Sequence, residues 1–254
     1  MNFRSIFWAM MVSFAFLEGV SGQQFQDLNF ESAKLVTVSS GMVQFAQAFP
    51  GWTLTVTNPF SPDALYDTVY LDSAGISIID NTANTPSFLA GDVIQGRYTA
   101  ILQSGNGYPP GGGMVPSDVT LSQTGMVPPG TESLEFEIEP LLIGAGNFEV
   151  TLDGQPLSLA PLGTGSNYEL FGADISQWAG QTAQLAFTVF AQVPHRDDEY
   201  LALDAIQFSS QLVPEPGVLS LLALGGLLLI RAIRRAMWVQ IKRRAWPLTI
   251  IVGV

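Results

Sequence analysis

Side chains with oxygen atoms are the main candidates for chemistry in this chain, because its 254 residues include no cysteine and one histidine, His195. A thiolate nucleophile, a disulfide and a cysteine-based metal site are therefore excluded, as is a site built from two histidines of one chain. His195 precedes Asp197 and Asp198, and such an acid can orient an imidazole that acts as a general base. Because no Gly-x-Ser-x-Gly elbow supplies a nucleophile, we interpret His195 as a residue of a solvated loop.

Three glutamates, Glu135, Glu137 and Glu139, alternate with hydrophobic residues in segment 133–139. Alternate side chains of a β-strand share a face, so these carboxylates are expected on one side and the hydrophobic residues on the other. Paired carboxylates are the catalytic groups of most glycosidases. Because nothing in the sequence places any of the three opposite another acid, we interpret them as water-facing residues of one strand.

The longest run of turn-forming residues, 105–113, contains Asn106 and Tyr108. A tyrosine ring can stack on a sugar and an amide can hydrogen-bond its hydroxyls, so these two residues are candidates for glycan binding. A plain hairpin connection is the alternative. The prolines of the run 105–113, and the lack of a Lys-Ser/Thr pair after it, argue against a phosphate loop. Trp52 and Trp178 are assigned to the core or a sheet edge instead of a sugar-binding platform.

Alternation of apolar and polar residues recurs from about residue 43 to residue 208, and no amphipathic helical stretch competes with it. Runs rich in Thr, Val, Phe and Leu predict strands at 52–57, 133–139, 147–152, 183–190 and 200–208. Asp153-Gly154 predicts a β-hairpin turn. Many short strands without helices predict one all-β domain, a jelly-roll β-sandwich, over residues 23–210.

Ionisable residues are unevenly distributed in this chain, whose formal net charge is −12. Residues 24–213 carry 20 acidic and three basic side chains, a net charge of −17, whereas residues 231–254 carry six basic side chains and no acidic one. The acidic balance argues against a nucleic-acid partner. Basic residues beside an apolar segment are retained on the cytoplasmic side of a membrane, so this segregation predicts a translocated domain with an inner basic tail.

The N-terminal residues 1–22 have the three-part layout of a secretory signal peptide. Arg4 is followed by the apolar run 6–17 and then by Gly19, Ser21 and Gly22. A helix of 12 residues spans about 18 Å, too little to cross about 30 Å of hydrocarbon. We therefore predict a cleaved signal-peptide helix and export, with a buried N-terminal helix as the alternative.

A proline motif, an apolar run and a basic stop follow one another near the C-terminus. The motif consists of Val213, Pro214, Glu215 and Pro216, the apolar run covers residues 218–230, and the stop consists of Arg231, Arg234 and Arg235. Two prolines keep the motif extended. This order resembles the PEP-CTERM sorting signal of envelope-associated bacterial proteins.

The resemblance to PEP-CTERM proteins implies a sorting motif and linker at 211–217, and a transmembrane helix with its basic stop at 218–235. It also implies recognition by an exosortase-type processing enzyme, an inner-membrane-anchored precursor, and a final place in the envelope, at the surface or in the extracellular matrix. Residues 236–254 depart from the family, whose members usually stop soon after the arginines. This basic extension is either an interfacial amphipathic segment or a tail without function.

Three short segments resemble the galactose-binding-domain-like jelly rolls, which include many carbohydrate-binding modules. They are Asn29-Phe30-Glu31, Pro50-Gly51-Trp52 and the last predicted strand at 200–206, and the pattern of 173–187 is similar to a strand–turn–strand element of the same modules. The resemblance implies a structural Ca²⁺ held by an early acid and an aspartate of the final strand, here Glu31 and Asp204. Oxygen ligands suit this hard cation. Ordinary strand-edge acids are the alternative interpretation.

These observations together predict an exported, non-enzymatic protein of the envelope or extracellular matrix, whose β-sandwich module binds glycan. Its expected partners are an exosortase-type enzyme, the membrane and an extracellular polysaccharide. Two alternatives stay open, namely a polysaccharide-active enzyme and a structural or adhesive surface protein without a small ligand.

Overall fold

The computed structural model describes residues 23–57, 63–69, 73–82, 93–107, 109, 111–141, 148–191, 200–213 and 231. The predicted signal peptide, Tyr108 and His195 lie outside these residues, as do Pro214, Glu215, Pro216, Arg234 and Arg235. Within the described part of the chain, no helix has the length and apolar character that a membrane crossing requires. The predicted transmembrane segment 218–235 lies, apart from Arg231, outside that part.

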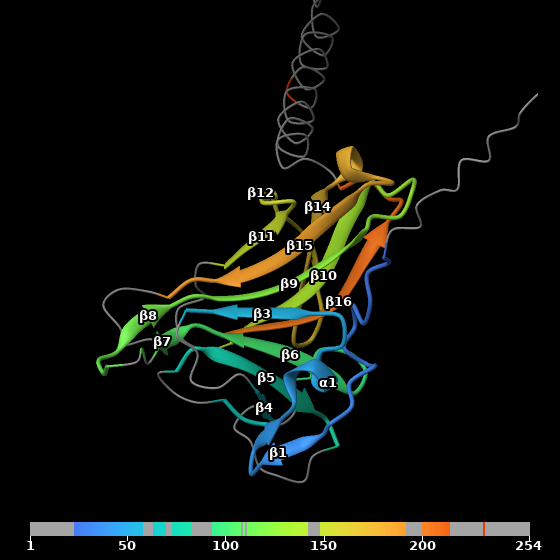
Figure 1. Ribbon diagram of the computed structural model, residues 1–254. Helices are drawn as coiled ribbons and strands as arrows, with labels where there is room; N and C mark the ends of the chain where they lie inside the picture. The colour runs from blue at the N-terminus through green and yellow to red at the C-terminus, as the bar shows by residue number, and fades with distance from the viewer. Residues whose placement is uncertain are drawn as a thin grey trace, which may run out of the picture.

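Two β-sheets form the body of the protein (Figure 1). The large sheet has nine strands in the order β1 (Thr37–Ser39), β2 (Met42–Val43), β4 (Ala64–Tyr66), β5 (Gly75–Asp80), β6 (Tyr98–Gln103), β16 (Tyr200–Ser209), β10 (Ser133–Leu141), β14 (Glu169–Asp174) and β13 (Ala160–Thr164). The small sheet has five, in the order β12 (Gln155–Pro156), β11 (Phe148–Leu152), β15 (Thr182–Val189), β9 (Val119–Met126) and β3 (Thr53–Val56). A separate hairpin pairs β7 (Gly105–Gly107) with β8 (Val115–Ser117).

One continuous hydrophobic core lies between the two sheets. The Phe136 ring of β10 meets the Phe187 ring of β15 edge-on, with 5.2 Å between ring centroids, so it joins the large sheet to the small one. Trp52 and Trp178 are 6% and 7% exposed and belong to the same cluster, as predicted. The prediction of an all-β sandwich is therefore confirmed.

The strand predictions from alternation hold to within about two residues. Segments 147–152, 183–190 and 200–208 correspond to β11, β15 and β16. Asp153 and Gly154 have φ angles of 52° and 73° between β11 and β12, so the predicted hairpin turn is confirmed. No pattern in the sequence predicts α1 (Phe45–Ala48), a single helical turn whose only buried residue is Ala48.

The alternating glutamates of β10 lie on the outer face of the large sheet, away from the core. The expectation that they face water is wrong in part, because Glu135, Glu137 and Glu139 are each only half-exposed. The outer face is covered locally by other segments. For example, Leu162 of β13 and Val213 pack so closely on Gly172 of β14 that a Cβ atom there would lie 2.7 Å and 2.8 Å from their methyl carbons.

Candidate ligand pocket and acidic clamp

A β-bulge interrupts the last strand where it crosses the centre of the large sheet. Asp204 pairs with Glu137 and Gln207 pairs with Glu135, which leaves Ala205 and Ile206 opposite Phe136. Ala205 has a φ of 49°, a left-handed conformation that is uncommon for a residue with a side chain. The extra residue changes which side chains face outward, and bulges of this kind often lie next to functional sites.

The bulge leaves Asp204 on the outer face with its carboxylate fully enclosed (0% exposed). Its Oδ2 accepts hydrogen bonds from the Thr99 hydroxyl at 2.6 Å and the Gln95 backbone N–H at 3.2 Å. Its Oδ1 accepts the Ala205 N–H at 2.7 Å. Burial raises the pKa of Asp204 to about 7, since the loss of hydration outweighs these three bonds, and the charge of Glu31 acts in the same direction.

Glu31, which belongs to the N-terminal part of the chain, binds the same loop segment that Asp204 binds. Its Oε1 accepts the backbone N–H groups of Arg97 at 2.7 Å and Tyr98 at 3.0 Å. Between these contacts and the Gln95 contact, Gly96 has a φ of 65°, and a Cβ atom there would collide with the Glu31 carboxylate. The two acids predicted to act together therefore hold one segment, residues 95–99, and we call Glu31 and Asp204 the acidic clamp.

Apolar contacts hold the preceding part of this loop on the outer face. Val93 and Ile94 pack against a second hydrophobic cluster that includes Ile101 and Ala202. The Val93 carbonyl accepts a hydrogen bond from the Asn167 side chain at 3.1 Å. Residues 93–99 are thus held at both ends by contacts within the protein, without a ligand.

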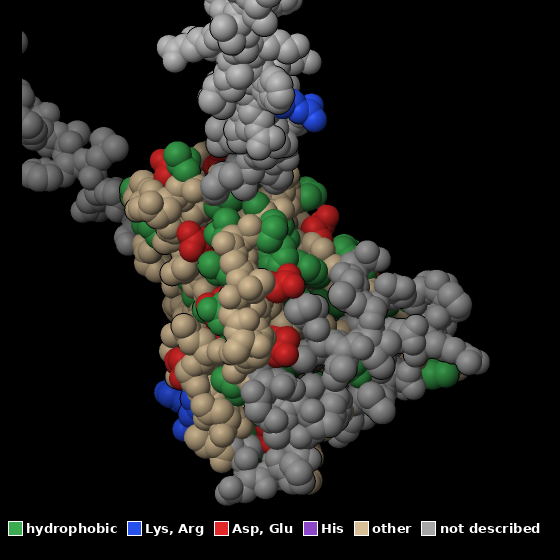
Figure 2. Space-filling model, turned by 180° about the vertical axis from the view of Figure 1, so that it is seen from behind, with side chains coloured by type: hydrophobic (Ala, Val, Ile, Leu, Met, Phe, Trp, Pro, Cys, Tyr) green, Lys and Arg blue, Asp and Glu red, His purple; other side chains and the backbone are tan. Residues whose placement is uncertain are grey.

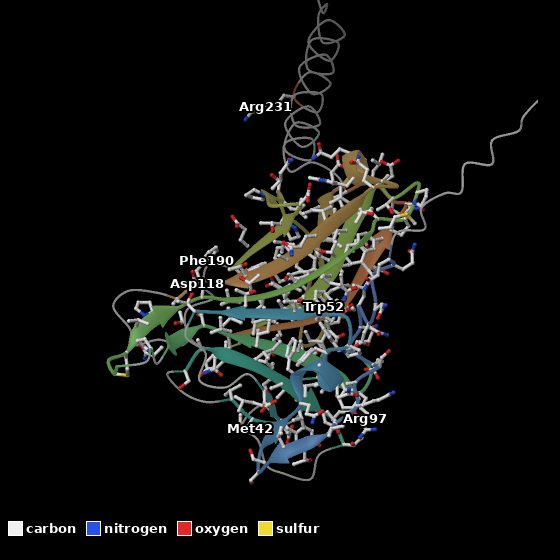
Figure 3. All side chains as sticks on the ribbon, in the orientation of Figure 1. Met42, Trp52, Arg97, Asp118, Phe190 and Arg231 are labelled. Carbon is white, nitrogen blue, oxygen red and sulfur yellow. The ribbon has the colours of Figure 1, made fainter. Side chains whose placement is uncertain are left out.

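The nearest basic side chain, Arg97, pairs with a different acid. Its guanidinium donates to both carboxylate oxygens of Asp80, at 3.1 Å and 3.0 Å, and it lies near the β1 end of the molecule (Figure 3). Burial opposes ionisation of Asp80, but the hydrogen bonds from Arg97 and Thr82 outweigh it and lower its pKa to about 2. This pair is the one Lys/Arg–carboxylate contact within 4 Å that is found among the described residues.

The acidic clamp fits a cation in charge, because neither carboxylate has a Lys or Arg partner within 4 Å in the described ranges. The cavity that Glu31 occupies depends on the missing Cβ of Gly96. However, the described part of the chain has no group of three or more acidic or histidine side chains arranged to hold a metal ion. Ca²⁺ binds six to eight oxygens, so the clamp would supply two ligand residues and carbonyl or amide oxygens the others.

A pocket of about 400 Å³ opens at the bulge, beside the clamp. Its polar lining consists of the amides of Asn29, Gln95 and Gln207 and the carboxylate of Glu137, and Leu28, Ala205 and Ile206 complete it. The N-terminal segment is tied to the strand here by a bond from the Ile206 N–H to the Leu28 carbonyl at 3.0 Å. The pocket therefore joins four segments that are far apart in the sequence, and its volume is within the range of small-molecule sites.

Glu137 is the one ionisable side chain of this lining. Its Oε2 is shielded from solvent and has no hydrogen-bond partner among the described residues. Burial raises the pKa of Glu137, and a hydrogen bond between the carboxylate and Tyr168 partly offsets this rise. A shielded carboxylate oxygen without a donor is destabilising on its own.

Of the two residues predicted from the turn-rich run, only Asn106 is described, and it does not belong to the lining of this pocket. Asn106 lies in β7, is 5% exposed, and has a side-chain oxygen without a hydrogen-bond partner. Its carbonyl accepts the Ala74 N–H at 3.0 Å. Because Tyr108 lies outside the described residues, its role as a sugar platform stays a prediction.

Sequence reasoning missed the three pocket amides. Gln207 could not be assigned to the outer face, since simple alternation places residues 203, 205 and 207 on one side and the bulge breaks that alternation. Asn29 stands two residues before Glu31, and this was the only available signal for it. Seen from behind, the described surface has acidic side chains scattered among hydrophobic and polar ones (Figure 2).

Comparisons with known proteins place this chain in no established family. No family model and no curated protein matches it. Several solved structures are similar in part: the adhesin domain K2 of Lys-gingipain has 16% identity and a TM-score of 0.37, with 71% of this chain and 96% of that chain covered. The module TmCBM61, in complex with β-1,4-galactotriose, has 11% identity and a TM-score of 0.33, with 74% and 99% covered.

The tailspike protein 4 domain of bacteriophage CBA120 has 15% identity and a TM-score of 0.34, and the match covers 72% of this chain but only 21% of the tailspike chain. Similarities of this size assign neither a family nor a ligand to this chain.

Proposed function

We propose that this chain is an exported, non-enzymatic protein that binds glycan in the pocket at the β16 bulge. The pocket lining carries the proposal, because three amide side chains surround an open volume of about 400 Å³. An amide both donates and accepts hydrogen bonds, which matches the mixed character of sugar hydroxyls.

The setting of the two neighbouring acids favours binding over catalysis. Glu137 and Asp204 are paired across β10 and β16, but Asp204 is fully enclosed and accepts three hydrogen bonds from the protein. A glycosidase needs two carboxyl groups that both reach the scissile bond. Asp204 is better suited to holding the 95–99 segment than to contacting a sugar.

Loss of a pocket amide is expected to weaken glycan binding about tenfold, the effect of one or two hydrogen bonds. Isothermal titration of the protein with a panel of neutral gluco-, galacto- and manno-oligosaccharides checks this for Gln207→Ala. The matched control is Gln155→Ala, which removes an exposed amide from β12 of the small sheet. Equal binding by the parent and Gln207→Ala, or binding of no glycan at all, would contradict the proposal.

We also propose that the domain is a jelly roll of the galactose-binding-like type, with a structural Ca²⁺ at the acidic clamp. Glu31 and Asp204 would hold the cation, with further oxygen ligands from the backbone. When bound, it would neutralise two converging carboxylates. The residues themselves already fix the loop through backbone N–H groups, so the cation would add stability to a segment that is in place.

Export and envelope sorting are proposed from the sequence of residues 1–22 and 213–235, together with the opposite charges of the two parts of the chain. The mature protein from native cells is expected to lack residues 1–22 and to end within the Pro214–Pro216 region. Intact mass spectrometry checks both ends, with a Pro214→Ala, Pro216→Ala double variant as the unprocessed control. A mass that extends through Val254 would argue against processing.

A further inference from the structure

The pocket at the bulge has an electrostatic preference that its amides do not explain. Glu137 is its one charged side chain, and no lysine or arginine belongs to the described lining. Arg97, the basic residue of the adjacent loop, is engaged by Asp80. A ligand that enters the pocket therefore meets a carboxylate without a counterion.

The carboxylate of Glu137 also lacks part of its hydrogen bonding. Tyr168 hydrogen-bonds to it, yet Oε2 is shielded from water and has no donor. Asp204, a second buried carboxyl group, lies opposite Glu137 on the neighbouring strand. Asp204 is enclosed and accepts three hydrogen bonds from the protein, so Glu137 is the carboxylate that a ligand in the pocket meets.

A protonated amine satisfies this site better than a hydroxyl does. Both can donate a hydrogen bond to Glu137, but the ammonium also neutralises its charge. Charge-assisted hydrogen bonds are about twice as strong as neutral ones. The Gln207 amide donates to Glu135 at 2.9 Å and the Asn29 Oδ1 accepts the Glu31 N–H at 3.4 Å. Each amide therefore keeps part of its hydrogen-bonding capacity for the hydroxyl groups of the same ligand, and Gln95 also lines the pocket.

We propose that the preferred ligand of this pocket is a glycan with free amino groups, a polymer or oligomer of the glucosamine type, whose ammonium binds Glu137. This inference rests on the proposed function and specifies the class of glycan. An N-acetylated sugar of the same skeleton presents a neutral amide at that position and lacks the charge.

The test is isothermal titration of the full-length protein at 0.15 M salt with three probes of equal length: a glucosamine oligomer, its N-acetylated form and a neutral gluco-oligosaccharide. The glucosamine oligomer is expected to bind at least tenfold more tightly than the other two. Glu137→Gln keeps the shape of the side chain and is expected to abolish that preference while neutral binding is retained. The urea unfolding midpoint of the variant reports that its fold is intact.

Asp153→Asn is the matched control for general attraction between an acidic protein and a cation. It removes one charge from an exposed turn of the small sheet, and Asn-Gly suits that turn as well as Asp-Gly does. Its preference for the glucosamine oligomer should equal that of the parent. A preference that survives Glu137→Gln, or falls equally in Asp153→Asn, would overturn the inference.

Two further outcomes distinguish a failure of this inference from a failure of the proposed glycan-binding function. Equal binding of all three probes would overturn the amino-sugar preference and leave glycan binding standing. Binding of none of them, nor of the wider neutral panel, would overturn both.

Discussion

Replacing Asp204 with alanine is expected to lower the free energy of unfolding by about 3–5 kcal/mol at pH 5, because several buried groups lose their partner at once. The Thr99 hydroxyl and the N–H groups of Gln95 and Ala205 all donate to this carboxyl group. Urea unfolding gives the value. The control is Glu169→Ala on the exposed side of β14, for which a change within about 0.5 kcal/mol is expected.

A loss below about 1 kcal/mol in Asp204→Ala would mean that the acidic clamp does not hold the loop. The expected effect is larger at pH 5 than at pH 7 or above because the folded protein keeps Asp204 mostly protonated at pH 5, with a pKa of about 7. The hydrogen bonds are then present without the cost of a buried charge.

The same carboxyl group gives the protein a definite pH dependence. Its pKa is about 7 in the folded state against 3.8 in the unfolded chain, so between about pH 4 and pH 7 the folded state holds a proton that the unfolded state releases. Stability should therefore fall as pH rises through this window and level off above it. Asp80, whose pKa is lowered to about 2, acts in the opposite direction and only below about pH 4. Asp204→Asn should flatten the profile above pH 4, apart from the contributions of Glu137 and Asp27, whose pKa values burial also raises.

Calcium is expected to stabilise the protein at pH 8, where Asp204 is ionised, by about 2.7 kcal/mol at a hundredfold excess over its dissociation constant. Chelation should remove this gain, and Glu31→Gln and Asp204→Asn should each abolish it, since each removes one of the two acids of the clamp. Urea unfolding with added Ca²⁺ or with chelator measures the difference.

Magnesium is the control for general charge screening, because it demands a smaller octahedral site and gives up water reluctantly. Equal stabilisation by the two cations would point to screening of an acidic surface. If calcium has no effect at pH 8, the clamp does not bind it and is held only by hydrogen bonds from the N–H groups of the 95–99 segment.

The sandwich could be predicted from the sequence because alternation reports directly on which face of a strand meets the core. The face of β10 that carries Leu134, Phe136 and Ile138 is buried, as this pattern indicates. The Asp153-Gly154 turn was equally visible, since its residues tolerate the positive φ that the turn requires.

The pocket could not be predicted, for two physical reasons. Alternation carries no information about a bulge, and the extra residue at Ala205 decides which side chains of β16 face outward. Alternation also cannot show which segments cover the outer face of a sheet. Glu137 is therefore expected in water from the pattern alone, whereas in the folded chain it is half-buried beneath neighbouring segments.

The pairing of Glu31 with Asp204 could be predicted only in part. No spacing rule connects two acids so far apart in sequence, and only a family resemblance brought them together before the fold was known. In the structure they bind neighbouring backbone groups of one loop, and Gly96 makes the close approach of Glu31 feasible.

An NMR titration of the ¹⁵N-labelled protein with the tightest-binding oligosaccharide tests the central claim, glycan binding at the β16 bulge, most directly. The side-chain amide signals of Asn29, Gln95 and Gln207 are expected to shift most, while that of Asn106 in the β7–β8 hairpin stays in place. Shifts centred on Asn106, with the three pocket amides unchanged, would contradict it.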